Sequence, residues 1–368
     1  MLENLLPSPF RVLSIDGGGM RGLYSASFLA GISQLFERER ETGMLDIGKG
    51  FDLIVGTSTG AILGCAAAVG EPMSKVAKLY KEHGKAIFPI RLPTNLTGAL
   101  MQAKTRPRHL KNGDQALRAA LVAVLQQRTI AQVYAERGIA LAIPAVEMGH
   151  QRSWVFKTPH LGGHRDDHFT LVDVCMASSA APIFRSLAAI QMADGLGGHR
   201  VFADGGLWAN NPVLVALLDA LQMAPVDREI EIFALGTCPR PEGEAIEEDE
   251  VHRGLLEWKL GGKALQLSLS AQEFAFDNMA RLFAGVLETL GRKVSIIRFP
   301  NGAVPPDTLQ YLDLDDARPE ATNRLLAQAR ADVVFTKSAC DDKRNVVGQQ
   351  IARLFRDMPP LQPSPTGE

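Results

Sequence analysis

Two segments near the N-terminus repeat one plan, in which an apolar strand leads into a glycine-rich loop and then into a helix. The first reads FRVLSI, DGGGMRG and a helical pattern from LYSASF, and the second reads FDLIVG, TSTG and AILGCAAAVG. A strand followed at once by a helix is the building unit of parallel α/β sheets. Both loops then lie at the carboxyl ends of strands, the sheet edge where sites form. The sequence therefore predicts an α/β fold with a site built from these loops.

The rest of the chain continues the α/β pattern without an internal repeat or a clear linker. Further strands are predicted at GIALAIPAVEM, RSWVFKT, EIEIFALGT and SIIRF. Helices are predicted at QALRAALVAVLQQ and over about 255–290. The segment from about 89 to 114 is rich in Pro, Gly, Asn, Lys and Arg, so we expect an irregular lid or cap over about 89–125. We expect residues 1–358 to form a single domain and residues 359–368 to be a flexible tail.

Composition excludes several classes of protein. The chain has 368 residues, 46% of them hydrophobic, which fits a globular protein with a large core and excludes disorder and coiled coil. A formal charge of −2 without a basic run gives no electrostatic footprint for DNA or RNA. Four widely spaced cysteines indicate reduced thiols. With neither a signal peptide nor a long apolar run, we expect a cytoplasmic protein that touches the membrane only peripherally.

The second loop has the outline of a nucleophile elbow. Its Gly-x-Ser-x-Gly pattern places Ser58 between Gly56 and Gly60, directly after a buried strand. A sharp strand-to-helix turn lifts the serine hydroxyl clear of the sheet, and glycines on both sides allow the strained backbone and close packing. The small-residue helix that follows points its positive amino end toward charge forming at the serine. A plain tight turn is the alternative, but the placement favours Ser58 as the nucleophile.

A serine hydroxyl needs a base to take its proton, and the histidines of this chain are poorly placed for that role. In a Ser-His-Asp α/β-hydrolase the histidine comes late in the chain, and only His252 does so here. It stands in the acidic segment EEDEVHRG, and the esterase alternative depends on it. His160, His164 and His168 are spaced four apart, but the Gly-Gly and Asp-Asp pairs between them indicate a polar loop, and we expect no metal site.

A carboxylate acting directly on the serine is the remaining way to activate it. Two Asp-Gly steps compete within MADGLGGHRVFADGGLWANNP. Asp194 stands between two short apolar runs, which is typical of a hairpin turn. Asp204 ends the strand RVFA and enters a loop before a helix, so it lies on the same kind of strand-end loop as Ser58. Asp204 is therefore the candidate base.

The first loop, DGGGMRG, exposes a row of backbone N–H groups at a strand end, and such a concavity binds anions. One use is phosphate or nucleotide binding by a non-catalytic module. The loop lacks the Lys-Ser/Thr that ends a P-loop and departs from G-x-G-x-x-G. The other use is an oxyanion hole, with the N–H groups of Gly17, Gly18 and Gly19 aimed at the tetrahedral intermediate and Arg21 lending positive charge nearby.

In their order, DGGGMRG, GTSTG and DGGLWANNP resemble the motifs of the patatin-like phospholipase family, and the likeness covers roughly residues 10–215. ASSAAPIF at 177–184 is similar to a further family block. The resemblance implies a three-layer α/β fold with a mostly parallel central sheet and helices on both faces. It also implies a Ser58–Asp204 dyad without a catalytic histidine, an oxyanion hole at Gly17 to Gly19 supported by Arg21, and no cofactor or metal.

The resemblance implies the reaction as well, which is hydrolysis of a fatty-acyl ester in a membrane phospholipid through an acyl-enzyme. A base of this kind needs a raised pKa, and we expect burial to raise that of Asp204. The charged, helical C-terminal part resembles bacterial members that cyclic oligonucleotides activate in antiphage defence. No residue identifies a nucleotide site, and the Lys and Arg residues of 91–113 fit a nucleotide, lipid headgroups or solubility alone. The oligomeric state stays open, a homo-oligomer included.

Overall fold

The computed structural model describes residues 8–93, 96–192, 198–238, 246–254, 258, 261–302 and 304–362. Within them, eight strands form one sheet in the order β5-β6-β3-β2-β1-β7-β8, with β4 paired to β3 outside this order. The strands are β1 (Phe10–Ile15), β2 (Leu53–Gly56), β3 (Ala140–Glu147), β4 (Arg152–Lys157), β5 (Ala188–Gln191), β6 (His199–Asp204), β7 (Ile230–Leu235) and β8 (Val294–Phe299).

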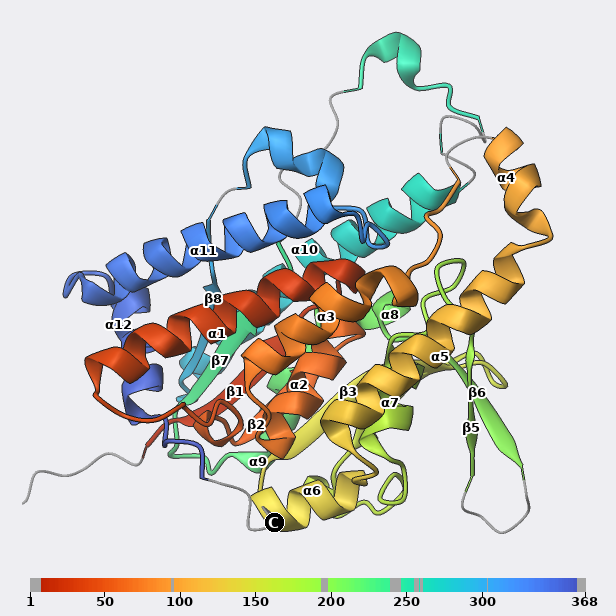
Figure 1. Ribbon diagram of the computed structural model, residues 1–368. Helices are drawn as coiled ribbons and strands as arrows, with labels where there is room; N and C mark the ends of the chain where they lie inside the picture. The colour runs from red at the N-terminus through yellow and green to blue at the C-terminus, as the bar shows by residue number, and fades with distance from the viewer. Residues whose placement is uncertain are drawn as a thin grey trace, which may run out of the picture.

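Five adjacent strands, from β8 through β7, β1 and β2 to β3, run parallel, and helices cover both faces of the sheet (Figure 1). The helices are α1 (Gly22–Glu39), α2 (Thr59–Val69), α3 (Met73–Ile87), α4 (Leu96–Ala103), α5 (Arg106–Leu125), α6 (Ile130–Arg137), α7 (Leu171–Ser178), α8 (Gly206–Ala209), α9 (Val213–Met223), α10 (Gly262–Thr289), α11 (Pro319–Asp341) and α12 (Val346–Asp357). The predicted three-layer α/β fold with a mostly parallel sheet is confirmed.

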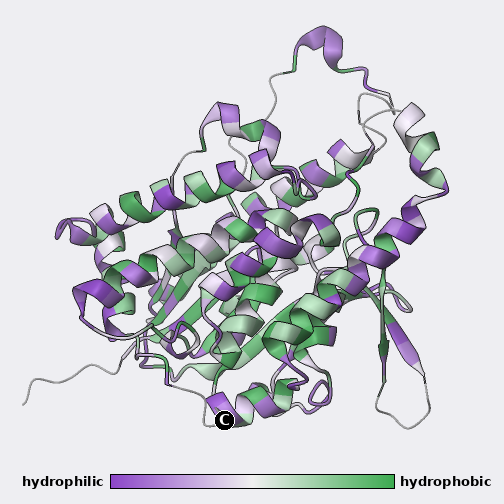
Figure 2. Cartoon of the chain, viewed as in Figure 1, coloured by the Kyte–Doolittle hydropathy of each residue, from purple (hydrophilic) through white to green (hydrophobic). Residues whose placement is uncertain are grey.

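The sheet separates two hydrophobic cores, and alternate residues of β1 enter different ones. Leu13 and Ile15 belong to a large core shared with helices α1, α2, α3, α5, α7, α11 and α12. Val12 points the other way, into a smaller core with α9 and α10. Figure 2 shows the strands and the helix faces against them as predominantly hydrophobic. The period of two along β1 thus builds both layers at once.

One edge of β3 is shared by two strands that run toward each other. Near its start, β3 pairs in parallel with β2, at Ala140 to Ala142. Near its end, β3 pairs antiparallel with β6, where Ala145 lies opposite Asp204. The C-terminal ends of β2 and β6 therefore meet beside the middle of β3. This meeting point positions the site described below.

The predicted irregular chain over about 89–114 is wrong for most of that segment, because α4 and the first half of α5 are helical, whereas the helix predicted at QALRAALVAVLQQ is present as the second half of α5. Pro107 and Gly113 suggested an irregular chain, yet both fit within α5. Pro107 lies in the first helical turn, where its missing N–H has no partner to lose. A Cβ on Gly113 would come within 2.4 Å of the Ile87 carbonyl oxygen, so glycine lets α5 pack closely on the end of α3.

Two further expectations concern the hairpin around Asp194 and the C-terminal tail. Strands β5 and β6 pair antiparallel, as the predicted hairpin requires, while Asp194 lies outside the described residues. The flexible tail is wrong for its first residues, since the backbone of Pro359 and Leu361 bonds to that of Asp46 and Met44. These bonds fix the chain beyond α12, and residues 363–368 are outside the described part.

The expectations drawn from composition concern cysteines and membrane spans. All four cysteines are buried and free of disulfide bonds, as predicted. Among the described residues, no helix combines the length and apolar character needed to cross a lipid bilayer.

Candidate active site

Ser58 sits on a strained turn between β2 and α2. Its φ of 55° and ψ of −118° are rare for a residue with a side chain and cost on the order of 1–3 kcal/mol. The turn is held from two sides: the Ser58 N–H donates to the Ser178 hydroxyl at 2.8 Å, and the Thr57 N–H donates to the Ile15 carbonyl at 3.1 Å. The geometry is that of a nucleophile elbow.

The two elbow glycines are required by close backbone approach. A Cβ on Gly56 would lie 2.2 Å from the carbonyl oxygen of Gly60. A Cβ on Gly60 would lie 2.2 Å from the carbonyl oxygen of Ile15, at the end of β1. Because both obstacles are backbone atoms, no side-chain movement can relieve the clash. The sequence prediction that these positions serve packing is in agreement with this geometry.

Asp204 meets Ser58 where β6 ends. The Ser58 hydroxyl donates to Oδ2 of Asp204 at 2.7 Å, and the Gly206 N–H donates to Oδ1 at 2.6 Å. The backbone N–H of Asp204 donates to the Ala180 carbonyl at 3.0 Å, which fixes the position of the carboxylate. Both carboxylate oxygens are therefore oriented, one by the loop and one toward the serine. The predicted pair is brought together, although by strands that run in opposite directions.

Burial raises the pKa of Asp204 to about 6, against an ordinary value near 4. The Gly206 N–H, the Ser58 hydroxyl and the Arg185 guanidinium oppose this rise, because each stabilises the charged form. A carboxyl group with this pKa is mostly ionised at neutral pH and is a stronger base than a free aspartate. The expected elevation of the pKa is thus present, and burial is its cause.

The glycine loop offers two free N–H groups beside Ser58 instead of the predicted three. The Gly17 N–H already donates to the Asn210 carbonyl at 2.9 Å, so it is not available to an oxyanion. Gly18 and Gly19 line the same pocket as Ser58, and within the described chain their N–H groups have no hydrogen-bond partner. The Gly17 carbonyl accepts from Thr237 Oγ1 at 2.8 Å, which holds the loop in place.

Arg21 acts on the loop rather than on the reacting atoms. Its Nε donates to the Gly18 carbonyl at 3.4 Å and its Nη1 to the Cys238 carbonyl at 3.3 Å. It lines a separate hollow that it shares with Asp16 and Arg298. The predicted support by Arg21 therefore runs through the backbone, and the guanidinium does not line the pocket around Ser58.

The structure adds two pocket residues that the motifs did not identify. Asn210 lines the pocket and is held from α10, where Gln272 Oε1 accepts from its N–H at 2.7 Å and Glu273 accepts from its side chain. Arg185 is a buried cation in the pocket wall, paired with Asp114 of α5 at 2.5 Å. Asn210 lies in the quoted segment DGGLWANNP and Arg185 follows ASSAAPIF, but only the fold shows what each contacts.

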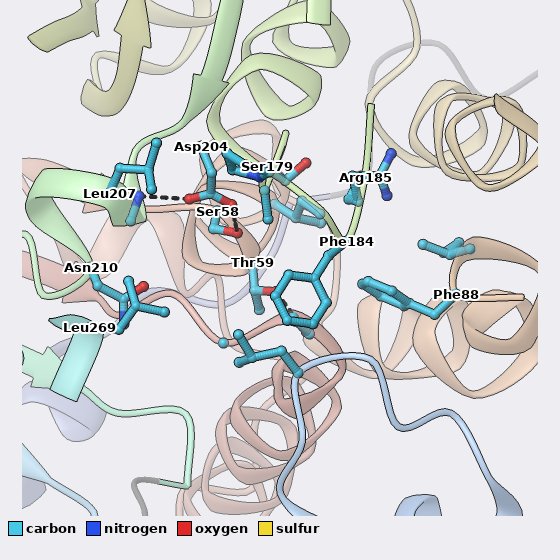
Figure 3. A pocket seen from close by; sticks show the side chains of 18 of the residues that line it. Ser58, Thr59, Phe88, Ser179, Phe184, Arg185, Asp204, Leu207, Asn210 and Leu269 are labelled. Carbon is cyan, nitrogen blue, oxygen red and sulfur yellow. Dashed lines mark hydrogen bonds between the residues drawn. The ribbon is translucent and has the colours of Figure 1, made fainter. Parts of the chain in front are cut away.

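The pocket around Ser58 is lined mainly by hydrophobic side chains. In Figure 3, Asn210 and Leu269 lie on one side of Ser58, while Phe184 and Phe88 lie on the other. The apolar part of the lining comes from several helices and loops and includes Ile62, Tyr80, Ile87, Phe88, Leu117, Ala181, Pro182, Phe184, Leu207, Leu265, Leu269 and Leu314. A lining of this kind fits an acyl chain and offers few groups to a polar substrate.

The rejected candidates lie elsewhere. His252 is exposed and, among the described residues, no histidine lines the pocket around Ser58. His160 Nε2 lies 3.4 Å from a carboxylate oxygen of Asp219, and His164 Nδ1 lies 2.7 Å from one of Asp167, so each histidine contacts a carboxylate away from Ser58. The described part of the chain contains no group of three or more His, Cys, Asp or Glu side chains that could hold a metal ion.

A strained serine at a strand-to-helix elbow, hydrogen-bonded to a buried carboxylate and flanked by free N–H groups, is the arrangement of a serine hydrolase. The sequence model of the family "Patatin-like phospholipase" matches residues 13–217. The chain belongs to the patatin-like phospholipase family and is a lipid acyl hydrolase.

Bacterial relatives resemble the chain over most of its length. The chain is 32% identical to a "cGAMP-activated phospholipase" of Pseudomonas aeruginosa, over 86% of this chain and 85% of that protein. It is 26% identical to a protein of the same description from Vibrio cholerae, over 90% and 93%. A "cUMP-AMP-activated phospholipase" of Escherichia coli is 29% identical over 63% of this chain and 66% of that protein.

The elbow packing predicts a stability cost for Gly60→Ala. The added methyl meets the Ile15 carbonyl, so we expect the free energy of unfolding to fall by about 1–3 kcal/mol. Gly285→Ala in α10 is the matched control, because no atom lies within 4 Å of the new Cβ and alanine favours a helix, so it should raise stability by about 0.5–1 kcal/mol. Chemical denaturation measures both. Equal stability of the two variants would contradict the packing argument.

The pKa of Asp204 predicts the acid limb of the pH–rate profile. The base must be deprotonated, so kcat/KM should fall as pH drops below about 6 and level off above it. Arg185→Met removes a cation that lowers this pKa, so the midpoint should move to higher pH. Arg118→Met, which breaks a surface pair with Asp173, should leave it in place. A profile that stays flat between pH 5 and 8 would refute the assignment.

Proposed function

We propose that residues 1–358 form one catalytic domain that hydrolyses fatty-acyl esters of membrane phospholipids through a Ser58–Asp204 dyad. The observation that carries this proposal is the 2.7 Å hydrogen bond from the Ser58 hydroxyl to Asp204, in a pocket whose described lining contains no histidine. Membership of the patatin-like phospholipase family supports the substrate class. The apolar pocket lining supports an acyl chain as the part of the substrate that is bound.

The first half of the reaction forms an acyl-enzyme. Ser58 Oγ attacks the ester carbonyl carbon while its proton passes to Oδ2 of Asp204. The carbonyl oxygen becomes an oxyanion that accepts hydrogen bonds from the N–H groups of Gly18 and Gly19. The C–O bond to the lipid alcohol then breaks, and the departing alkoxide takes the proton from Asp204. The lysolipid leaves and the fatty acyl group stays on Ser58.

The second half repeats the proton transfers with water. Asp204 takes a proton from a water molecule, whose oxygen attacks the acyl carbon of the ester on Ser58. The new tetrahedral intermediate uses the same two N–H groups, and it collapses by breaking the bond to Ser58 Oγ. The proton held by Asp204 returns to that oxygen. The fatty acid leaves and the dyad is restored.

A cyclic nucleotide is the activator that we propose for the enzyme. Three relatives that match most of this chain carry the description cGAMP-activated phospholipase, and the Escherichia coli relative carries cUMP-AMP instead. An enzyme that needs a cyclic nucleotide for activity would not attack its own cell's membrane peripherally from the cytoplasm until that nucleotide is present. With such regulation the enzyme would act as an antiphage effector, the role that the sequence resemblance implies. The nucleotide in the description differs among the relatives, so a panel of cyclic dinucleotides is needed to identify the activator of this chain.

Substitution of the dyad tests the catalytic roles. Ser58→Ala and Asp204→Asn should each lower lipid hydrolysis by about two to four orders of magnitude, because each removes a member of one proton-transfer unit. His252→Ala should keep near-normal turnover, whereas a Ser-His-Asp esterase would lose it. A fluorophosphonate probe should label Ser58 in the wild type. Absence of labelling would favour a non-catalytic binding module, and normal turnover of Asp204→Asn would overturn the dyad.

Cyclic-nucleotide activation is tested by assaying fatty-acid release with and without a panel of cyclic dinucleotides. We expect one member, with cGAMP and cUMP-AMP as the first candidates, to raise the rate on phospholipid vesicles severalfold or more. Linear dinucleotides of the same bases are the matched controls. Equal rates with every nucleotide and without any would refute the activator while leaving the hydrolase assignment intact.

A further inference from the structure

Helix α4 presents large apolar side chains to solvent. Leu100 is 76% exposed and Met101 is 81% exposed. Figure 1 shows α4 projecting at one corner of the molecule, beyond the start of α5. Because these adjacent side chains stay in contact with water, they add little hydrophobic stabilisation to the fold. Exposed apolar groups that cluster next to polar ones mark interaction surfaces.

The chain around α4 carries positive charge without negative charge. Residues 90–113 contain five Lys and Arg and neither Asp nor Glu. Of these cations, Lys104, Arg108 and Lys111 are exposed and form no salt bridge within the described residues. Acidic side chains gather instead in η4 (Glu248–Glu250), which follows β7 in the chain. The α4 corner is therefore both apolar and cationic.

Arg106, at the start of α5, ties this corner to the rim of the catalytic pocket. Its Nη2 and Nε donate to the Ile183 carbonyl at 2.8 and 3.2 Å. Ile183 lies between Pro182 and Phe184, which both line the pocket. Its own φ is 73°, an unfavourable conformation for a β-branched residue, and its side chain is 49% exposed. The strained turn thus holds an apolar side chain outward at the pocket rim.

Other exposed apolar side chains continue the rim. Leu207 lines the pocket and is still 38% exposed. Leu265 and Leu269, one turn apart on α10, also line the pocket and are partly exposed. A neighbouring hollow shares Leu265 and Leu269 and includes Arg91, whose carbonyl binds the Gln102 side chain of α4. The pocket mouth and α4 are therefore parts of one continuous surface.

We propose that Leu100 and Met101 of α4, with Lys104 in the turn that follows, Arg108 of α5 and the rim residue Ile183, dock the enzyme on an anionic phospholipid bilayer. This inference rests on the proposed function and adds the face by which the enzyme meets its substrate. Apolar side chains enter the acyl boundary while cations beside them bind anionic headgroups, a combination that neither a protein nor a neutral lipid surface satisfies as well. A lipid leaving the bilayer at this face has a short apolar path past Phe184 to Ser58.

Vesicle binding tests the apolar part of the surface without any catalysis. In a Ser58→Ala background, Leu100→Asp/Met101→Asp should weaken association with vesicles of equal parts phosphatidylglycerol and phosphatidylcholine by roughly tenfold or more, measured by flotation. Leu218→Asp on α9, which is 60% exposed, is the matched control and should bind as the parent does. Unchanged binding of the double variant, or an equal loss in the control, would overturn the proposal.

Charge reversal gives a second, independent test in which the substituted side chains remain charged and hydrophilic. Lys104→Glu/Arg108→Glu should lose roughly fivefold or more per cation on the anionic vesicles, and little on pure phosphatidylcholine. With Ser58 restored, both double variants should cleave soluble p-nitrophenyl butyrate at the wild-type rate. Loss of that activity, or a change in oligomeric state without a change in flotation, would overturn membrane docking. A wild type inactive on every ester would refute the proposed function alone, because flotation reads docking directly.

Discussion

The site depends on two strands that run toward each other along a single edge of β3. β2 approaches in parallel and delivers Ser58, while β6 approaches antiparallel and delivers Asp204. Because both strands are fixed by hydrogen bonds to the same partner, the 2.7 Å contact between the side chains is set by the backbone. A mobile loop would need to order each group separately. The proposed Ser58–Asp204 dyad would have no third residue to correct a misplaced member, so this rigidity would replace the orienting role of a histidine's partner.

The C-terminal part of the chain completes what the N-terminal motifs begin. The family match ends at residue 217, yet α10 supplies Leu265 and Leu269 to the pocket and holds Asn210 through Gln272. Arg298 of β8 forms salt bridges with Asp277 of α10 and with Asp16 at the start of the glycine loop. This cation therefore links β8, α10 and the loop. Burial of Asp16 raises its pKa, and Arg298 opposes that rise. A ligand that shifts α10 would therefore act directly on the loop beside Ser58.

Local patterns in the sequence predicted the strands, helices and loops of the site better than the contacts between distant parts of the chain. The elbow, the glycine loop and the strand before Asp204 follow from periodicity and turn chemistry within short windows. Gly17 illustrates what such windows miss, since its N–H is occupied by a carbonyl nearly 200 residues away along the chain, at Asn210. The first half of α5 was missed because Pro and Gly are read as breakers unless the first turn and the neighbouring backbone are known. In the sequence nothing distinguishes Arg185 from other basic residues, and only the packing of the fold buries it in the pocket wall.

The same apolar wall that suits an acyl chain also sets the strength of the base. Burial raises the pKa of Asp204 to about 6, and the side chains that line the pocket beside it are largely hydrocarbon. An acyl chain that fills the pocket displaces water from the carboxylate and strengthens both this desolvation and the N–H groups facing the oxyanion. A short ester fills less of the pocket and leaves the carboxylate better hydrated. We therefore expect long-chain lipid to be favoured twice, by the contacts that bind it and by the basicity that its binding would produce.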